Sequence, residues 1–287
     1  PCDCATDPVE GIRKMFVDIF QAGQIEAGEI PAQRPVFRRM HGVVHGRFVV
    51  RPDLPEELRV GVFGQKGEYP AWVRFSSDVQ PGTPDYKGTC GVGIKLFGVD
   101  GEKVMEPDQD ATTLDFLFQN FPVFFTDTAK DMCEATRAAL QGAAANAAYL
   151  EAHPVTAQIQ KEMQVVVPTV LGSDYWSVIP FRFGPRRYVK YKLEPELVPP
   201  GDTGEPDYDD PFYLRADLHE RMASGEARFR FMVQFRTDDA QMPLDRATVR
   251  WSEILSPPVH VATLVLPRQD LGTRGQDAYG ENLGYNP

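Results

Sequence analysis

Short runs of strand-forming residues lie on both sides of an alanine-rich middle section, and this pattern constrains the fold more than any other feature. The runs are 43–50, 71–75, 93–99, 188–191, 229–235 and 259–266. Each run is rich in β-branched and aromatic residues and is followed by turn-forming residues, which is typical of sandwiches and barrels. Because the same kind of strand occurs before and after the middle section, the pattern favours one interrupted domain over two.

Three segments have helical rather than strand-like patterns. Residues 11–22 carry apolar side chains at intervals of three and four, residues 127–152 are rich in alanine, and residues 214–223 are amphipathic. We therefore predict an α+β fold, in which a mostly antiparallel β-barrel carries inserted and flanking helices. Residues 1–33 are predicted to form an N-terminal arm with a helix, and residues 34–287 the barrel domain.

The charge and cysteine content exclude several classes of protein. The chain has 287 residues, with 30 Lys and Arg against 41 Asp and Glu and a net charge of −11, which argues against nucleic acid as a partner. No apolar run approaches the roughly 18 residues of a membrane span. Four cysteines, with no paired zinc spacing, predict a reduced cytoplasmic protein. The chain begins at Pro1 without a signal pattern, so we expect that it has been trimmed.

Several polar residues could carry chemistry, each with a structural alternative. His41 and His45 are either satisfied barrel histidines or catalytic groups, and their surroundings lack the helix and glutamate of a zincin. Residues 88–93 contain a G-x-G pattern, but a strand follows it, which argues against a dinucleotide site. Asn120 lies among aromatic residues, where its amide either caps a turn or binds a buried partner. The aromatic content of 11% fits a flat apolar cofactor or a phenylalanine-rich core.

Three motifs in the same order resemble the catalase superfamily, in particular its small single-domain haem proteins. They are Arg38-x-x-His41, Val73-Arg74-Phe75-Ser76 and Asn120-x-Pro122-Val123-Phe124-Phe125-x-Asp127. This resemblance implies a catalase-like barrel that binds haem b. It also implies that His41 moves the proton of a peroxide between its oxygens and that Asn120 orients the peroxide.

The resemblance also implies a set of cofactor contacts. Arg38 and Arg74 are expected to pair with the haem propionates, since a guanidinium fork suits a carboxylate. Ser76 and Phe125 lie in the same motifs and are expected to contact the cofactor. The family's axial ligand to the iron is a tyrosinate.

The sequence departs from the family where that tyrosine would lie. The family has an R-x-x-x-Y motif near its C-terminus, whereas Arg274 and Tyr279 are one residue too far apart. Residues 282–287 resemble the stretch that precedes this motif in the family. We therefore expect either that a C-terminal segment with the ligand is omitted or that the protein does not hold haem. The segment after His41 is also short, which makes His45 a second candidate for the distal histidine.

Three functions follow from these observations. The first is a haem-dependent peroxidase or catalase-like oxidoreductase, which acts on hydrogen peroxide or an organic hydroperoxide with an organic cosubstrate. The second is an enzyme that converts fatty-acid hydroperoxides. The third is a haem-free catalase-fold binding protein. An arm helix exchanged between copies would give a homo-oligomer, while one packed on its own barrel would not.

Overall fold

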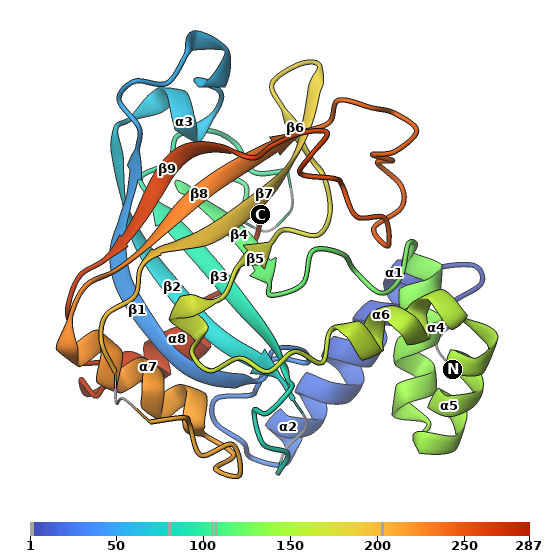
Figure 1. The fold of residues 1–287 in the computed structure, drawn as a ribbon. Coiled ribbons are helices and arrows are strands. Elements are labelled where there is room, and N and C mark those ends of the chain that lie inside the picture. Colours follow the sequence, from blue (N-terminus) through green and yellow to red (C-terminus); the bar gives the residue numbers. More distant parts are fainter. Residues whose placement is uncertain (1–2, 80–81, 105, 107, 202–203) are drawn as a thin grey trace.

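The fold is a closed antiparallel barrel with helices at one end and along one side (Figure 1). The computed structural model describes residues 3–79, 82–104, 106, 108–201 and 204–287. In these residues the strands are β1 (Arg39–Val50), β2 (Glu68–Asp78), β3 (Thr89–Phe97), β4 (Thr113–Gln119), β5 (Tyr175–Trp176), β6 (Phe181–Phe183), β7 (Arg187–Leu197), β8 (Ala227–Phe235) and β9 (Val259–Leu266). All of them except β6 form the barrel, in the order β5-β4-β3-β2-β1-β9-β8-β7, and pairing of β5 with β7 closes it. The predicted α+β barrel is confirmed.

The helices fall into two groups. They are α1 (Pro8–Arg13), α2 (Ala22–Glu26), α3 (Val62–Gln65), α4 (Ala129–Leu140), α5 (Ala143–Ala152), α6 (Pro154–Glu162), α7 (Tyr213–Ser224) and α8 (Gln276–Asn282), with a π-helical turn at Lys14–Gln21 and 3-10 turns at Glu56–Leu58 and Val170–Gly172. α7 and α8 lie at one end of the barrel, and α1, α4, α5 and α6 gather beside it (Figure 1). None of these helices has the length and apolar character needed to span a membrane.

Five of the six predicted strand runs lie within barrel strands, the run 93–99 extends two residues past the end of β3, and the helical segments are found with altered bounds. The arm helix is longer than predicted, because α1, the π-helical turn and α2 continue one another. The segment 127–152 is divided into α4 and α5 by Gly142, which has a φ of 106°. At the start of α4, the Thr128 hydroxyl accepts from the Asp131 N–H while the Asp131 carboxylate accepts from the Thr128 N–H.

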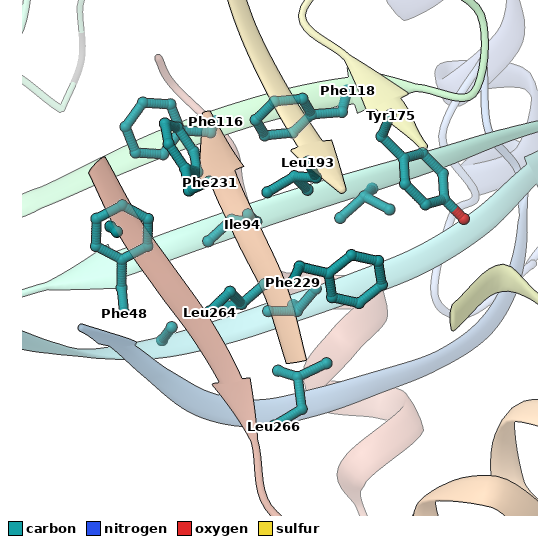
Figure 2. Close-up of a cluster of buried hydrophobic side chains, with 14 of the residues drawn as sticks. Phe48, Ile94, Phe116, Phe118, Tyr175, Leu193, Phe229, Phe231, Leu264 and Leu266 are labelled. Atoms are coloured by element: carbon teal, nitrogen blue, oxygen red, sulfur yellow. The ribbon is translucent and has the colours of Figure 1, made fainter. Parts of the chain in front are cut away.

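Aromatic side chains fill the barrel interior. Phe231 lies at the centre of this cluster, with its ring 4.8 Å from that of Phe116 and 5.0 Å from that of Phe48. Figure 2 shows these rings beside Ile94 and Leu264, and all five side chains are nearly or fully buried. The interior is therefore a packed aromatic core.

We expect Phe231→Ala to lower the free energy of unfolding by about 3–5 kcal/mol, because it leaves a cavity among the central rings. Phe212→Ala is the matched control, since Phe212 is 53% exposed and its ring stacks on Arg39 at the surface. Its cost should stay near or below about 1 kcal/mol. Urea unfolding of both variants measures the difference, and equal losses would contradict the central place of Phe231.

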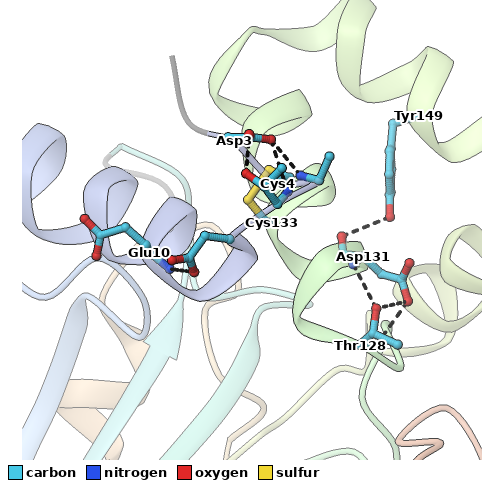
Figure 3. Close-up of a disulfide and its surroundings, with 10 residues drawn as sticks. Asp3, Cys4, Glu10, Thr128, Asp131, Cys133 and Tyr149 are labelled. Carbon is cyan, nitrogen blue, oxygen red and sulfur yellow. Dashed lines mark hydrogen bonds between the residues drawn. A yellow bond between two sulfur atoms is a disulfide. The ribbon is translucent and has the colours of Figure 1, made fainter.

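A disulfide joins the N-terminal arm to α4. Cys4 and Cys133 are bonded across a sequence separation of 129, and both are buried (Figure 3). A side-chain Cβ at Gly11 would lie 2.7 Å from Cys133 Sγ, so the first helix turn needs a glycine to pass the sulfur. The prediction of reduced cysteines was therefore wrong for this pair, since two cysteines so far apart in sequence give no local signal. Cys90 is free and buried.

Removing this cross-link should loosen the arm. We expect Cys4→Ser to lower stability by about 2–4 kcal/mol, because the unfolded chain regains the entropy of an open loop. The same variant should be cleaved faster by trypsin at Arg13 or Lys14. Reductant should reproduce both effects in the natural protein and should not change the variant further. An unchanged cleavage rate in the variant would show that the arm is held without the disulfide.

Candidate functional site

The motif around Arg74 is divided between the two faces of the barrel wall. Successive side chains of a strand point to opposite faces. On β2, Phe75 belongs to the interior cluster and Ser77 faces the same way, whereas Arg74 and Ser76 line a cavity on the outer face. The residues predicted as one site therefore lie in separate surroundings.

His41 lies on the inner side, at one end of the barrel. A β-bulge between Met40 and Gly42 makes His41 an extra residue in β1. Its imidazole is fully buried, and its Nε2 lies 2.7 Å from the Ser77 hydroxyl oxygen. Burial above all, and then the charges of Arg39, Arg74 and Arg215, lower the pKa of His41 to about 3. The imidazole is therefore neutral at ordinary pH.

Asp85 lies next to this histidine but does not bond to it. Its Oδ2 is 3.8 Å from His41 Nδ1, too long for a hydrogen bond, and neither atom has a hydrogen-bond partner among the described residues. Arg39 forms an ion pair with the other Asp85 oxygen at 3.2 Å. Burial raises the pKa of Asp85 to about 6 although Arg39 opposes the shift.

Asn120 and Cys90 join His41, Ser77 and Asp85 in a set of five residues that we call the inner polar group. Asn120 Oδ1 accepts the Cys90 N–H at 2.8 Å, and the Asn120 N–H donates to the Cys90 carbonyl at 3.0 Å. The Asn120 side chain thus binds a buried backbone N–H of β3, which is the second of the two alternatives that the sequence left open. The Cys90 thiol lies 3.8 Å from the Ser77 hydroxyl, and burial raises its pKa to about 12.

The outer cavity has a volume of about 360 Å³ and lies against β2, β3 and β4. Its lining residues are Arg34, Pro35, Val36, Phe37, Arg74, Ser76, Gly91, Val92, Gly93, Leu117, Phe118 and Tyr285. The wall is apolar apart from two guanidinium groups, a serine hydroxyl and a phenol. Such a cavity suits a small molecule with an apolar body and an anionic edge.

Arg34 and Arg74 supply the positive charge. Arg34 donates to carbonyls at the end of α8, including that of Leu283 at 2.7 Å, and Arg74 donates to the Phe37 carbonyl at 3.0 Å and to Glu281 at 3.1 Å. The Nε atoms of both arginines are buried and have no hydrogen-bond partner in the described part of the chain. Burial, and then the nearby Arg74, lower the pKa of Arg34.

Two glycines of β3 let aromatic rings lie directly on the strand. A Cβ at Gly91 would lie 2.5 Å from the Phe37 ring, and one at Gly93 would lie 2.9 Å from the Tyr285 ring. Phe37 has a φ of 49°, which is uncommon for a residue with a side chain. Hydrogen bonds at its N–H, to Asp78, and at its carbonyl, from Arg74, hold this conformation.

The structure brings only some of the predicted site residues together. Arg74 and Ser76 line the outer cavity, while His41 and Asn120 belong to the inner polar group. Arg38 and Phe125 line a second cavity beside α4.

The sequence interpretation missed Arg34 and Phe37, which line the outer cavity with Arg74. A signal for them existed, because Arg34-x-x-Phe37 repeats the spacing of Arg38-x-x-His41 four residues earlier. No cluster of three or more metal-ligating His, Cys, Asp or Glu side chains occurs among the described residues.

Solved catalases have a similar fold. A fungal catalase superimposes with a TM-score of 0.68 and 17% identity, over 92% of this chain and 55% of its own. A bacterial catalase gives 0.67 and 18%, over 88% and 51%, and catalase A from Saccharomyces cerevisiae gives 0.65 and 16%, over 88% and 55%. Neither a protein-family model nor a curated protein matches the sequence. The chain therefore has a catalase-like fold and spans about half the length of these catalases.

The inner polar group predicts a dependence of stability on pH. Because the folded pKa of His41 is lowered, its contribution is fully present above the unfolded value of 6.5 and is lost as the pH falls toward about 3. The raised pKa of Asp85 acts in the opposite direction, because its carboxyl binds a proton on folding between the ordinary value of 3.8 and about 6.

We therefore expect Asp85→Asn, which removes the opposing group, to lose stability more steeply than the natural protein between pH 6 and pH 4. The slope should differ by up to about 1.4 kcal/mol per pH unit. Urea unfolding across this range measures the slope. Adding His41→Gln to Asp85→Asn should remove the loss of stability at acid pH, because the double variant lacks the imidazole that titrates. Parallel curves for the natural protein and Asp85→Asn would contradict the assignment.

Proposed function

We propose that the outer cavity holds haem b and that the protein is an oxidoreductase acting on hydrogen peroxide or an organic hydroperoxide. The observation that carries this proposal is the pair of arginines Arg34 and Arg74 at the edge of an apolar cavity, whose buried Nε atoms have no hydrogen-bond partner among the described residues. The similarity of the fold to proteins named as catalases supports the same function.

The charged edge of the cavity fits a dicarboxylate. Arginine binds carboxylates through paired N–H groups, and two arginines match the two propionates of haem. Glu281 pairs with the Nη2 atom of Arg74. Arg34 therefore supplies positive charge for a ligand, and Arg74 supplies its Nε–H as a donor. In this proposal Arg34 and Arg74 hold the propionates, which takes over the propionate role that the sequence assigned to Arg38.

The wall of the cavity fits a flat ring. Gly91 and Gly93 carry no side chains, so a planar group can approach the strand closely. Phe37 and Tyr285 now occupy that approach, and their rings must move off the glycines or stack on the incoming ring. The apolar neighbours Val92 and Leu117 would exclude water from the bound group.

The positions of the residues around the cavity determine how each would act on a peroxide. When bound, haem supplies the iron at which a peroxide reacts. Ser76 also lines the cavity, and its hydroxyl would hydrogen-bond a peroxide, while the two guanidiniums hold the propionates. We propose that His41 and Asn120 act from the inner face as positioning residues: His41 through Ser77 and Asn120 through the backbone of Cys90. Among the described residues that line the cavity, Tyr285 carries a phenol, which is a group that binds haem iron in other proteins.

Titration with hemin tests the proposal. We expect a Soret band to form with the natural protein, and Arg34→Ala and Arg74→Ala each to weaken binding by about 10–100-fold, the worth of a charged hydrogen bond. The dimethyl ester of hemin, which lacks the carboxylates, should bind equally weakly to all of them. Arg182→Ala is the matched control, since Arg182 also donates to backbone carbonyls, at Gly184 and Pro185, far from the cavity.

Two results would overturn the haem proposal. One is the absence of a Soret band, and the other is equal affinity of the natural protein and Arg74→Ala for hemin. Either would favour the second candidate, a haem-free binding protein of catalase-like fold. The observation behind that candidate is the packing of Phe37 and Tyr285 on the two glycines, which already covers the wall of the cavity.

A further inference from the structure

A second cavity lies between the barrel, the arm helix and α4–α5. Its volume is about 540 Å³, within the range of small-molecule sites. Pro35 and Val36 line both this cavity and the outer cavity, so the segment between Arg34 and Arg38 forms a common wall. The two cavities are therefore neighbours that share this wall.

One side of the second cavity is an apolar helix face. Met132, Ala135, Ala139 and Leu140 of α4 line it at helical spacing, and Phe16 of the arm lies across from them. The two alanines are short, which leaves a trough between the larger side chains. Thr136, Asn146 and Gln160 also line the cavity with polar side chains, and the apolar trough along α4 fits an extended apolar chain.

The charged side of the cavity is Arg38. Its guanidinium stacks on the Phe20 ring at 4.0 Å, and its Nε donates to the Pro35 carbonyl at 3.0 Å. Within the described residues, no carboxylate lies within 4.0 Å of it. Asp78 also lines the cavity, but its oxygen accepts the Phe37 N–H. The Nη groups of Arg38 thus hold a positive charge at the end of an apolar trough.

We propose that this second cavity binds the carboxylate of a fatty acid, with the carboxylate on Arg38 and the alkyl chain along α4. The match is one of charge and shape, because a single cation at one end and an apolar trough beyond it complement a monocarboxylate with one long chain. The Cys4–Cys133 disulfide ties the arm to α4, so both apolar sides are fixed before the ligand enters. This site does not depend on the haem proposal.

Isothermal titration with dodecanoate, without haem, tests the charged end. We expect the natural protein to bind dodecanoate, Arg38→Ala to bind it at least tenfold more weakly, and Arg38→Lys to lie between them. Arg182→Ala should bind as the natural protein does, and so should Leu117→Ala, because Leu117 lines the outer cavity and not the second one. The methyl ester should bind the natural protein as weakly as dodecanoate binds Arg38→Ala. Equal affinity of the acid and its ester, or of Arg38→Ala and the natural protein, would overturn the proposal.

Two further variants test the trough and the neighbouring acid. Ala139→Phe should weaken dodecanoate binding at least fivefold and leave the weaker binding of butanoate unchanged, since it blocks the far part of the trough. Asp78→Asn should tighten dodecanoate binding severalfold, because it removes a negative charge while its side-chain oxygen still accepts the Phe37 N–H. Circular dichroism of each variant checks that the fold is retained. Equal effects of Ala139→Phe on both acids would overturn the trough assignment.

Discussion

Closure of the barrel by the pairing of β5 with β7 is the constraint on which the rest of the structure depends. Tyr175 pairs with Leu193 and Trp176 with Lys192, and this short contact gives every barrel strand one inner and one outer face. The inner faces meet around Phe231 and pack their aromatic side chains together. The two cavities described above lie outside this core, and one of them lies against a strand whose glycines allow close approach.

The sequence predicted the main strands because each combines a run of β-branched or aromatic residues with a flanking turn. It did not predict α8, whose apolar residues are few, or β4 (113–119), which overlaps the aromatic stretch around Asn120. The Cys4–Cys133 bond was also out of reach, because it joins segments that periodicity does not relate. These failures share a cause, since each depends on contacts distant in sequence.

The candidate site was predicted in part for the same reason. Arg74 and Ser76 sit two residues apart on one strand, so regular alternation puts both on the outer face. His41 depends on a β-bulge, and one extra residue reverses the faces that follow it. A linear motif cannot show such a change of register. The segment 34–37 was not predicted as part of the site, because Phe37 stands where the Arg-x-x-His motif has its histidine.

The disulfide that anchors the arm has a consequence for the order in which the chain matures. Cys4 leaves the ribosome long before Cys133, which lies 129 residues later. Because chains emerge at about 5–20 residues per second, the arm waits several seconds or more for its partner. The first strands of the barrel are synthesised during that wait. Oxidation of the pair then joins the arm to α4 after these strands have been made. Cys133 lies before the middle of the chain, so its oxidation precedes the synthesis of β7, β8 and β9 if an oxidant is present, and the arm is then tied to α4 before the barrel closes.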